Sequence, residues 1–376
     1  MGTSKVFFTD MRTKVGESLL AKMDRLVIKA GIEQIDFKQK YVAIKVHFGE
    51  PGNLAFLRPN FAKVVVDRVK ALGGMPFLTD CNTLYVGRRN NALVHMDAAF
   101  ENGYTPFSTG CHNIIADGLK GTDDVETPVS GGIYCKTARI GRAIIDADIV
   151  LSLTHFKGHE MTGFGGALKN LGMGSGSRAG KMYMHSDGKP VVDQKLCAGC
   201  RVCEKFCNQK AFVFGANKKM SIDIDKCVGC GRCIGVCNFH AIENNSGTSF
   251  HDLDCKMVEY VKAVLDGRPN FHISVVNQVS PYCDCHNESD AAVVPDIGIF
   301  AGFDPVALDK ACIDAVNNAP AVETSILSER TRSHKAEGGG HDHFVDVHPE
   351  VHWQDQIEHS EKIGLGSGNY ELVTVK

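Results

Sequence analysis

Eight of the fifteen cysteines lie in one short stretch and repeat a single spacing. Each run has the form Cys-x2-Cys-x2-Cys-x3-Cys, and the second run begins at Cys227, thirty positions after Cys197. The same offset aligns Asp193 with Asp223, so the stretch is an internal repeat. Paired zinc ribbons would give two Cys-x2-Cys pairs separated by a longer loop, not two runs of four. The pattern therefore favours iron–sulfur ligation over zinc.

The spacing is typical of cubane clusters with four irons and four sulfurs. Three thiolates at i, i+3 and i+6 wrap three corners of one cube, and the fourth cysteine reaches the other cube. By this rule the first cluster takes Cys197, Cys200, Cys203 and Cys237. The second cluster takes Cys227, Cys230, Cys233 and Cys207. Both cubes would be fully ligated, so we expect them to pass single electrons rather than bind a substrate.

The stretch from Val191 to Asn245 resembles the bacterial two-cluster ferredoxins through these motifs. The resemblance implies two 4Fe-4S clusters in a small α+β domain with pseudo-twofold symmetry. That family has proline after the fourth cysteine, whereas this chain has Asn208 and Asn238. The departure leaves the turn geometry and the cluster potentials open, but not the ligands.

Outside the cysteine repeat, strands and helices must position any other reactive side chains. Strands are expected at 41–46, 76–79, 149–154, 271–279 and 297–300, and helices at 59–72 and 306–317. Strands that alternate with helices predict an α/β fold with a mainly parallel sheet flanked by helices. We expect residues 1–190 and 246–376 to form one α/β domain that carries 191–245 as an inserted ferredoxin-like domain. Two separate α/β lobes flanking the insertion are the alternative.

Polar side chains follow the expected strands at their carboxyl ends. In open parallel sheets, ligands bind beyond these ends, so the residues should gather at one edge. The set comprises His47, Asp80, His155, His159, Cys283, Cys285 and Asp304.

The segment THFKGHEMTGFGGALKNLGMG (154–174) supplies the candidate catalytic residues His155, His159 and Lys169. A glycine-rich loop between a strand and a helix favours phosphate or carboxylate binding at the helix N-terminus. The loop fits neither G-x-G-x-x-G nor the P-loop pattern, so no nucleotide site is inferred. The alternative is that these side chains only shape a loop.

Four segments together resemble the family called domain of unknown function 362, whose members are often labelled iron–sulfur centre proteins. They are KVHFGEPGN, the 154–174 segment, SPYCDC and FDPVALDKACID. The stretch from His159 to Lys169 is also similar to the nickel-pincer lactate racemases. That resemblance implies that Lys169 matches the lysine that tethers the pincer cofactor, and that His185 matches a later nickel ligand.

The remaining cysteines and histidines are open to more than one interpretation. Cys283 and Cys285 form either a third metal site or a redox thiol pair, or belong to a turn with incidental cysteines. Five others are expected to be buried apolar residues: Cys81, Cys111, Cys135, Cys255 and Cys312. A solvated polar loop is expected to hold the C-terminal histidines His334, His341, His343, His348, His352 and His359.

The bulk composition narrows the classes of function. The formal charge is −3 with basic residues spread along the chain, which gives no electrostatic footprint for nucleic acid. No apolar run approaches the roughly 20 residues of a membrane span, and the start lacks a signal-peptide core, so a cytoplasmic protein is expected. The favoured function is a redox enzyme whose clusters feed electrons to a site in the α/β domain, with a redox partner protein or a small-molecule substrate. A plain electron carrier and a non-catalytic sensor or metal-handling protein are the alternatives.

Overall fold

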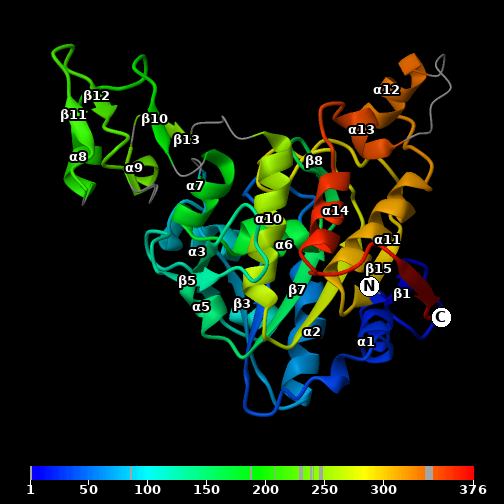
Figure 1. The fold of residues 1–376 in the computed structure, drawn as a ribbon. Helices are drawn as coiled ribbons and strands as arrows, with labels where there is room; N and C mark the ends of the chain where they lie inside the picture. The colour runs from blue at the N-terminus through cyan, green and yellow to red at the C-terminus, as the bar shows by residue number, and fades with distance from the viewer. Residues whose placement is uncertain are drawn as a thin grey trace.

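An eight-stranded sheet forms the centre of the molecule (Figure 1). The computed structural model describes residues 2–84, 87–186, 189–207, 209–227, 232–237, 239, 241–244, 249–334 and 342–376. In spatial order the strands are β16 (Tyr370–Thr374), β1 (Ser4–Asp10), β15 (Gly298–Gly302), β14 (Asn270–Val276), β7 (Ile149–His155), β2 (Tyr41–Lys45), β3 (Met75–Asp80) and β4 (Asn113–Ile115). The sheet takes strands from the chain both before and after 191–245.

The middle of the sheet is parallel, as the sequence predicts. The pairs β14–β7, β7–β2, β2–β3 and β3–β4 all run parallel. All seven residues of β7 are buried, which is typical of a strand covered on both faces. Along β7, Ile149, Leu151 and Leu153 contact one apolar core, whereas Val150 contacts the other. Each such aliphatic side chain contributes about 1.5–3 kcal/mol on burial.

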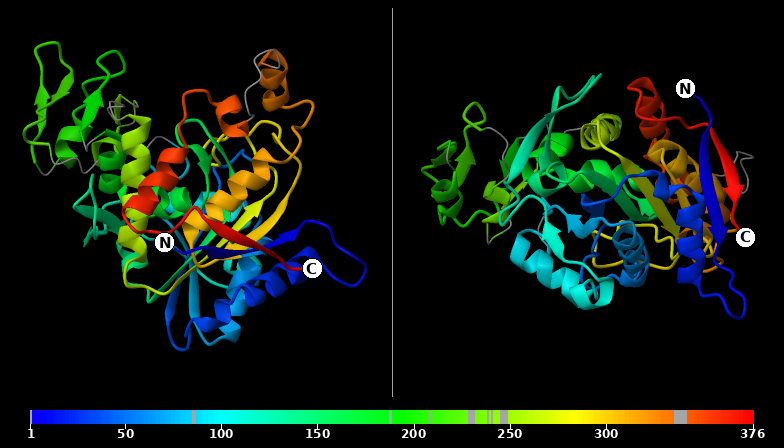
Figure 2. Two further views of the ribbon diagram at one scale, coloured as in Figure 1. Left: turned by 45° about the vertical axis from the view of Figure 1, so that its right-hand side comes forward. Right: turned by 90° about the horizontal axis from the view of Figure 1, so that it is seen from below.

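Helices cover both faces of the sheet (Figure 2). One face packs against α1 (Leu19–Lys29), α2 (Pro59–Ala71) and α3 (Ala92–Glu101). The other packs against α6 (Ala167–Ser175), α10 (Phe250–Leu265), α11 (Pro305–Asn317) and α14 (Gln354–Lys362). The α/β class is therefore confirmed.

The strand β15 corrects one part of the expected site. It runs antiparallel to both β14 and β1, so its carboxyl end points to the edge opposite those of β14 and β7. Asp304 follows β15 and therefore lies away from the other polar residues. Its side chain caps α11 by accepting hydrogen bonds from the Val306 and Ala307 amides, as expected, and it also accepts one from the hydroxyl of Ser4.

The segment between the two halves of the sheet forms its own small elements, at one side of the molecule in Figure 1. The strand β10 (Pro190–Val192) pairs antiparallel with β13 (Ile242–Asn244), and β11 (Phe212–Phe214) pairs antiparallel with β12 (Met220–Ile222). Two short helices accompany them, α8 (Val202–Phe206) and α9 (Arg232–Gly235).

Shorter elements complete the described chain. They are η1 (Ile32–Gln34), α4 (Pro106–Thr109), β5 (Asp124–Pro128), β6 (Thr137–Gly141), α5 (Arg142–Ile145), β8 (Lys157–His159), β9 (Gly163–Gly165), α7 (Arg178–Ser186), α12 (Ile326–His334) and α13 (His343–Val347). Among the described helices, none has the length and apolar character that crossing a membrane requires.

The expectation of a solvated histidine loop near the C-terminus is wrong for three of its members. His343 lies in α13 and bonds the Ala319 carbonyl, while His359 lies in α14 and bonds Glu259 at 2.8 Å. Both side chains are buried, and His348 bonds the Pro281 carbonyl at 2.8 Å. Hydrogen bonds to distant segments, which the local sequence does not reveal, draw them into the structure. His341 lies outside the described residues.

Candidate active site

A cavity of about 640 Å³ opens at the carboxyl edge of the parallel strands β2, β3, β7 and β14. It is lined by most of the polar residues that the sequence places there: His47, Asp80, His159, Lys169, Cys283 and Cys285. The structure thus brings these six side chains together, whereas Asp304, for the reason given above, and His155 do not line the cavity.

A buried ion pair forms the wall of the cavity at β2 and β3. Lys45 Nζ lies 2.9 Å from Asp80 Oδ1, and both side chains are at most 3% exposed. Burial opposes the charged form of Asp80, but the Lys45 ammonium holds the pKa of that carboxyl well below its usual range. Asn170 on α6 accepts a hydrogen bond from Lys45 Nζ and donates one to the hydroxyl of Thr154, which ties β2, β7 and α6 together.

A second polar group covers the end of β2. Arg89 donates to Glu50 Oε2 at 2.8 Å, and its Nη1 lies 2.8 Å from His47 Nε2. The Gly49 amide donates to the other ring nitrogen. Burial and the Arg89 charge hold the pKa of His47 well below its usual range. Glu50 lies within the segment KVHFGEPGN, where the sequence predicts a role only for His47, and Arg89 lies in a loop with no motif.

His155 lies beneath the cavity rather than in its wall. Its Nδ1 bonds Asp284 at 2.9 Å and its Nε2 bonds the Asn277 carbonyl at 2.7 Å, so neither nitrogen is available to a metal or substrate. Lys157 Nζ lies 3.4 Å from the same Asp284 carboxylate. Burial opposes ionisation, but these two cations lower the pKa of Asp284 to about 2. Since Asp284 stands between Cys283 and Cys285, His155 and Lys157 orient the loop that carries both thiols.

The strands β8 and β9 form a hairpin that presents His159 to the cavity. The Met161 and Thr162 amides both donate to His159 Nδ1 at 3.1 Å. An imidazole nitrogen that accepts hydrogen bonds carries no proton, so the neutral ring holds its proton on Nε2. Gly158, in β8, packs closely against the segment before Cys283, since an added Cβ would lie 2.5 Å from the Pro281 carbonyl oxygen.

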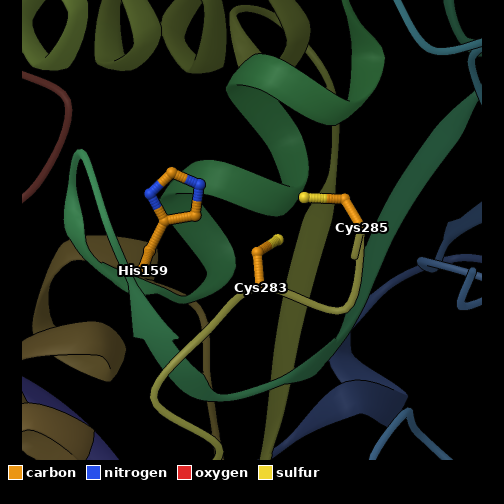
Figure 3. Close-up of side chains that lie close together, drawn as sticks. All are labelled: His159, Cys283 and Cys285. Atoms are coloured by element: carbon orange, nitrogen blue, oxygen red, sulfur yellow. The ribbon is translucent and has the colours of Figure 1, made fainter. Parts of the chain in front are cut away.

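Figure 3 shows His159, Cys283 and Cys285 pointing toward a common space. One ligand atom from each lies within 4.8 Å of the others. Lys169 Nζ, from α6, lies 3.1 Å from Cys283 Sγ. Cys283 is 1% exposed, whereas Cys285 is half-buried. The hydrogen bond from Cys285 and the charge of Lys169 outweigh burial and hold the pKa of the Cys283 thiol well below its usual range.

The glycine-rich loop does not offer a free helix N-terminus, contrary to expectation. Asp309 on α11 accepts hydrogen bonds from the Ala167 and Leu168 amides at 2.7 and 2.8 Å. A Cβ on Gly166 would lie 2.3 Å from the same carboxylate. The protein's own carboxylate thus occupies the anion position of α6, and this glycine makes room for Asp309 rather than for a bound phosphate.

His185 on α7 also lines the cavity. Burial, with the nearby Lys169 charge, lowers the pKa of His185 to about 4. The three residues that match the racemase pattern, His159, Lys169 and His185, therefore border one cavity.

Four cysteines of the small segment line a second, smaller cavity. They are Cys197, Cys200, Cys203 and Cys237. These are the first three thiols of the first run and the last thiol of the second, the set expected to share one cluster. Of the other set, Cys230 lies outside the described residues, as do Asn208 and Asn238.

One apolar cluster joins the cysteine-bearing segment to the large cavity. Leu84 packs in the same buried cluster as Cys203 and Cys233, and it also lines the large cavity. Met182 on α7 belongs to this cluster and is fully buried.

The five isolated cysteines are all buried, as expected: Cys81, Cys111, Cys135, Cys255 and Cys312. Cys81 nevertheless borders the large cavity. Burial raises the pKa of its thiol well above the ordinary value, so it stays protonated.

Comparison with known proteins adds the family. No curated protein matches the sequence. Among solved structures, the lactate racemase apoprotein of Thermoanaerobacterium thermosaccharolyticum is 10% identical, with a TM-score of 0.36 over 80% of this chain and 54% of that one. A protein of Thermotoga maritima is 11% identical, with a TM-score of 0.38 over 79% of this chain and 58% of that one. This chain therefore spans little more than half of either structure. The family model "Domain of unknown function (DUF362)" matches residues 42–314, and the chain belongs to that family.

Proposed function

We propose that this protein is an iron–sulfur oxidoreductase. Two 4Fe-4S clusters in 191–245 receive electrons from a redox partner and pass them to a substrate in the 640 Å³ cavity. Supporting the cluster assignment, Cys197, Cys200, Cys203 and Cys237 line one small cavity although Cys237 is remote in sequence. A site that gathers four thiols in this crossed pattern matches the ligation of two-cluster ferredoxins.

The observation that carries the catalytic part is the position of Leu84. This side chain is 4% exposed. It belongs to the apolar group of side chains that includes Cys203 and Cys233, and it also lines the large cavity. A plain carrier needs neither a large cavity bordered by charged side chains nor apolar packing between that cavity and the cysteine-bearing segment. The clusters supply single electrons, and the polar residues of the cavity bind and orient what is reduced.

One observation favours the carrier as a second candidate. Cys200 is exposed, so an edge of the first cluster would be accessible to a partner protein. In the oxidoreductase this edge is where electrons enter. In a carrier, electrons would both enter and leave at this edge, and the cavity would have no part in electron transfer.

Anaerobic purification followed by iron and sulfide analysis tests the cluster assignment. Two cubanes give about eight irons and eight sulfides per chain. Cys237→Ala should lose one cluster and the corresponding part of the electron paramagnetic resonance (EPR) signal after dithionite reduction. Cys255→Ala, which removes a buried thiol outside both runs, is the matched control and should keep the full iron content. Four or fewer irons in the unaltered chain after reconstitution would refute the assignment.

The same preparation separates enzyme from carrier. In an oxidoreductase, replacement of His159 and Lys169 leaves the clusters reducible by dithionite but abolishes their reoxidation by a compound that binds the cavity. In a carrier, cluster reoxidation is indifferent to both residues. Unchanged reoxidation in the double variant would therefore favour the carrier.

A further inference from the structure

The loop Cys283-Asp284-Cys285 places two thiols in the cavity wall, and its surroundings distinguish a metal site from a redox pair. A soft ion would need Cys283, Cys285 and His159 as ligands, since these atoms lie within 4.8 Å of one another. Two contacts oppose that arrangement. His159 Nδ1 accepts two backbone hydrogen bonds, which leaves the ring proton on Nε2, the nitrogen that a metal would need bare.

The second contact is Lys169. Its ammonium lies 3.1 Å from Cys283 Sγ, in a position that a bound cation would have to share. A buried ammonium and a metal ion repel each other strongly at such a separation. The same ammonium stabilises a bare thiolate, and so does the His159 Nε2–H. The arrangement thus suits a free thiolate better than a metal ligand.

We propose that Cys283 and Cys285 form a two-electron dithiol–disulfide centre that reduces a small-molecule disulfide bound in the cavity. This inference rests on the proposed function, because the two clusters return the electrons. Cys283 lines the cavity, carries the thiolate beside Lys169 and attacks the substrate, whereas the Cys285 thiol resolves the mixed disulfide.

The reaction balances with the groups present. The Cys283 thiolate attacks the substrate disulfide R–S–S–R′, forming a mixed disulfide between Cys283 Sγ and the R–S group and releasing R′S⁻. The leaving thiolate takes the proton of the Cys285 thiol. The Cys285 thiolate then attacks Cys283 Sγ, which releases RS⁻ and closes the Cys283–Cys285 disulfide. Attack by a thiolate through a mixed disulfide is the general route of such exchange.

Regeneration uses one electron from each cluster. Two electrons and one proton convert the disulfide back to the Cys283 thiolate and the Cys285 thiol. A disulfide between cysteines one residue apart is strained, and strained disulfides are more easily reduced. Lys169 and the His159 Nε2–H favour the thiolate product. The number of electrons matches, because two clusters supply one electron each and the disulfide takes up two.

The exchange is tested without reducing the clusters. Anaerobic protein is mixed with oxidised glutathione, quenched in acid, and analysed by peptide mass spectrometry. The proposal predicts two released glutathione thiols per chain and a disulfide between Cys283 and Cys285. Cys285→Ser should stop at glutathione attached to Cys283, and Cys283→Ser should not exchange. Cys111→Ala, a buried thiol outside the cavity, should behave as the unaltered protein does.

A charge-rescue series tests Lys169 as a positioning residue. Lys169→Met should slow formation of the Cys283–Cys285 disulfide about tenfold or more, as loss of one neighbouring charge shifts a thiol by about a pKa unit or more. Lys169→Arg should restore much of the rate. Equal rates in the Met and Arg variants would contradict the role of the charge.

A second mixing experiment tests the link to the clusters. After dithionite reduction and removal of the excess, oxidised glutathione should abolish the cluster EPR signal in the unaltered protein, but not in Cys283→Ala/Cys285→Ala. A disulfide that forms while the clusters stay reduced would leave the dithiol centre in place and refute its coupling to the clusters. Absence of any Cys283–Cys285 disulfide would overturn the dithiol centre and leave the proposed iron–sulfur function standing. A bound metal ion that depends on both thiols would have the same consequence.

Discussion

Among single residues, the Lys45–Asp80 pair places two buried charges in the wall of the cavity. The two groups lie 2.9 Å apart and are almost fully shielded from water. Removal of one partner from a buried pair leaves an uncompensated charge, which costs about 3–5 kcal/mol. Asp80→Asn should therefore lower the free energy of unfolding by an amount in that range.

The chain offers a matched control for this change. Lys63 and Asp67 form an ion pair at 2.8 Å on the surface, with both side chains about half exposed. Asp67→Asn should cost less than about 1 kcal/mol, because water screens the pair. Urea unfolding monitored by circular dichroism measures both variants. Equal losses in the two would contradict the special role of burial.

Buried histidines give the protein a pH dependence of stability. Burial lowers the pKa of His272 to about 3 from the ordinary 6.5. Between these two values the unfolded chain binds a proton that the folded chain excludes, so stability falls as pH drops below 6.5. The slope from one such group is about 1.4 kcal/mol per pH unit.

His272→Gln should flatten that slope by about this amount between pH 6.5 and 5. His272 bonds Ser152 and Asn270, contacts that an amide can partly replace. The exposed His112 provides the control, since His112→Gln should leave the slope unchanged. Urea midpoints measured across this pH range check both variants. A profile for His272→Gln that parallels the unaltered protein would speak against the assignment.

At the scale of elements, the junction between α6 and α11 determines where Lys169 stands. Asp309 caps the first amides of α6, and Gly166 leaves the space for its carboxylate. Gly166→Ala should displace Asp309 and cost about 1–3 kcal/mol, the value of leaving buried donors unsatisfied.

A double-mutant cycle isolates this contact. If the added methyl group acts through Asp309, the cost of Gly166→Ala should shrink markedly in an Asp309→Ala background. Thermal unfolding of the four proteins measures the coupling. Additive costs would show that the glycine is needed for some other reason.

At the scale of the whole molecule, Leu84 joins the cysteine-bearing segment to the cavity. Leu84→Asp should weaken that packing, because a charge cannot be buried there without a partner. Iron content should stay the same, while transfer of electrons from reduced clusters to the cavity should slow. Leu54, which is 82% exposed, is the control position for the same substitution. Stopped-flow absorbance of the clusters measures the rates, and equal rates at the two positions would refute this route.

The local sequence predicts the position of a strand well where that strand's own residues determine it. β-rich composition and the alternation of strand, loop and helix predict β2, β3, β7 and β14 to within a few residues. The carboxyl edge that these parallel strands share then brings together His47, Asp80, His159 and Cys283. The direction of β15 was not accessible in this way, because alternation along a strand is the same for either direction. Asp304 was misplaced for that reason.

Partners that are distant in sequence account for the other differences. The local sequence predicts an open N-terminus for α6, because Asp309 lies 142 positions after Ala167 and carries no motif that links the two. His155 was a catalytic candidate, yet Asp284 and the Asn277 carbonyl occupy both of its nitrogens. Tertiary hydrogen bonds of this kind follow from the assembled fold and leave no local signature.

We propose that two iron–sulfur clusters and a metal-free thiol pair share this chain. Anomalous diffraction at the iron edge, from anaerobically grown crystals of the full chain, tests this arrangement. We expect two four-iron peaks. One is held by Cys197, Cys200, Cys203 and Cys237, the other by Cys207, Cys227, Cys230 and Cys233, and no metal peak lies at Cys283 and Cys285. A single peak, or a metal bound between Cys283 and Cys285, would contradict it.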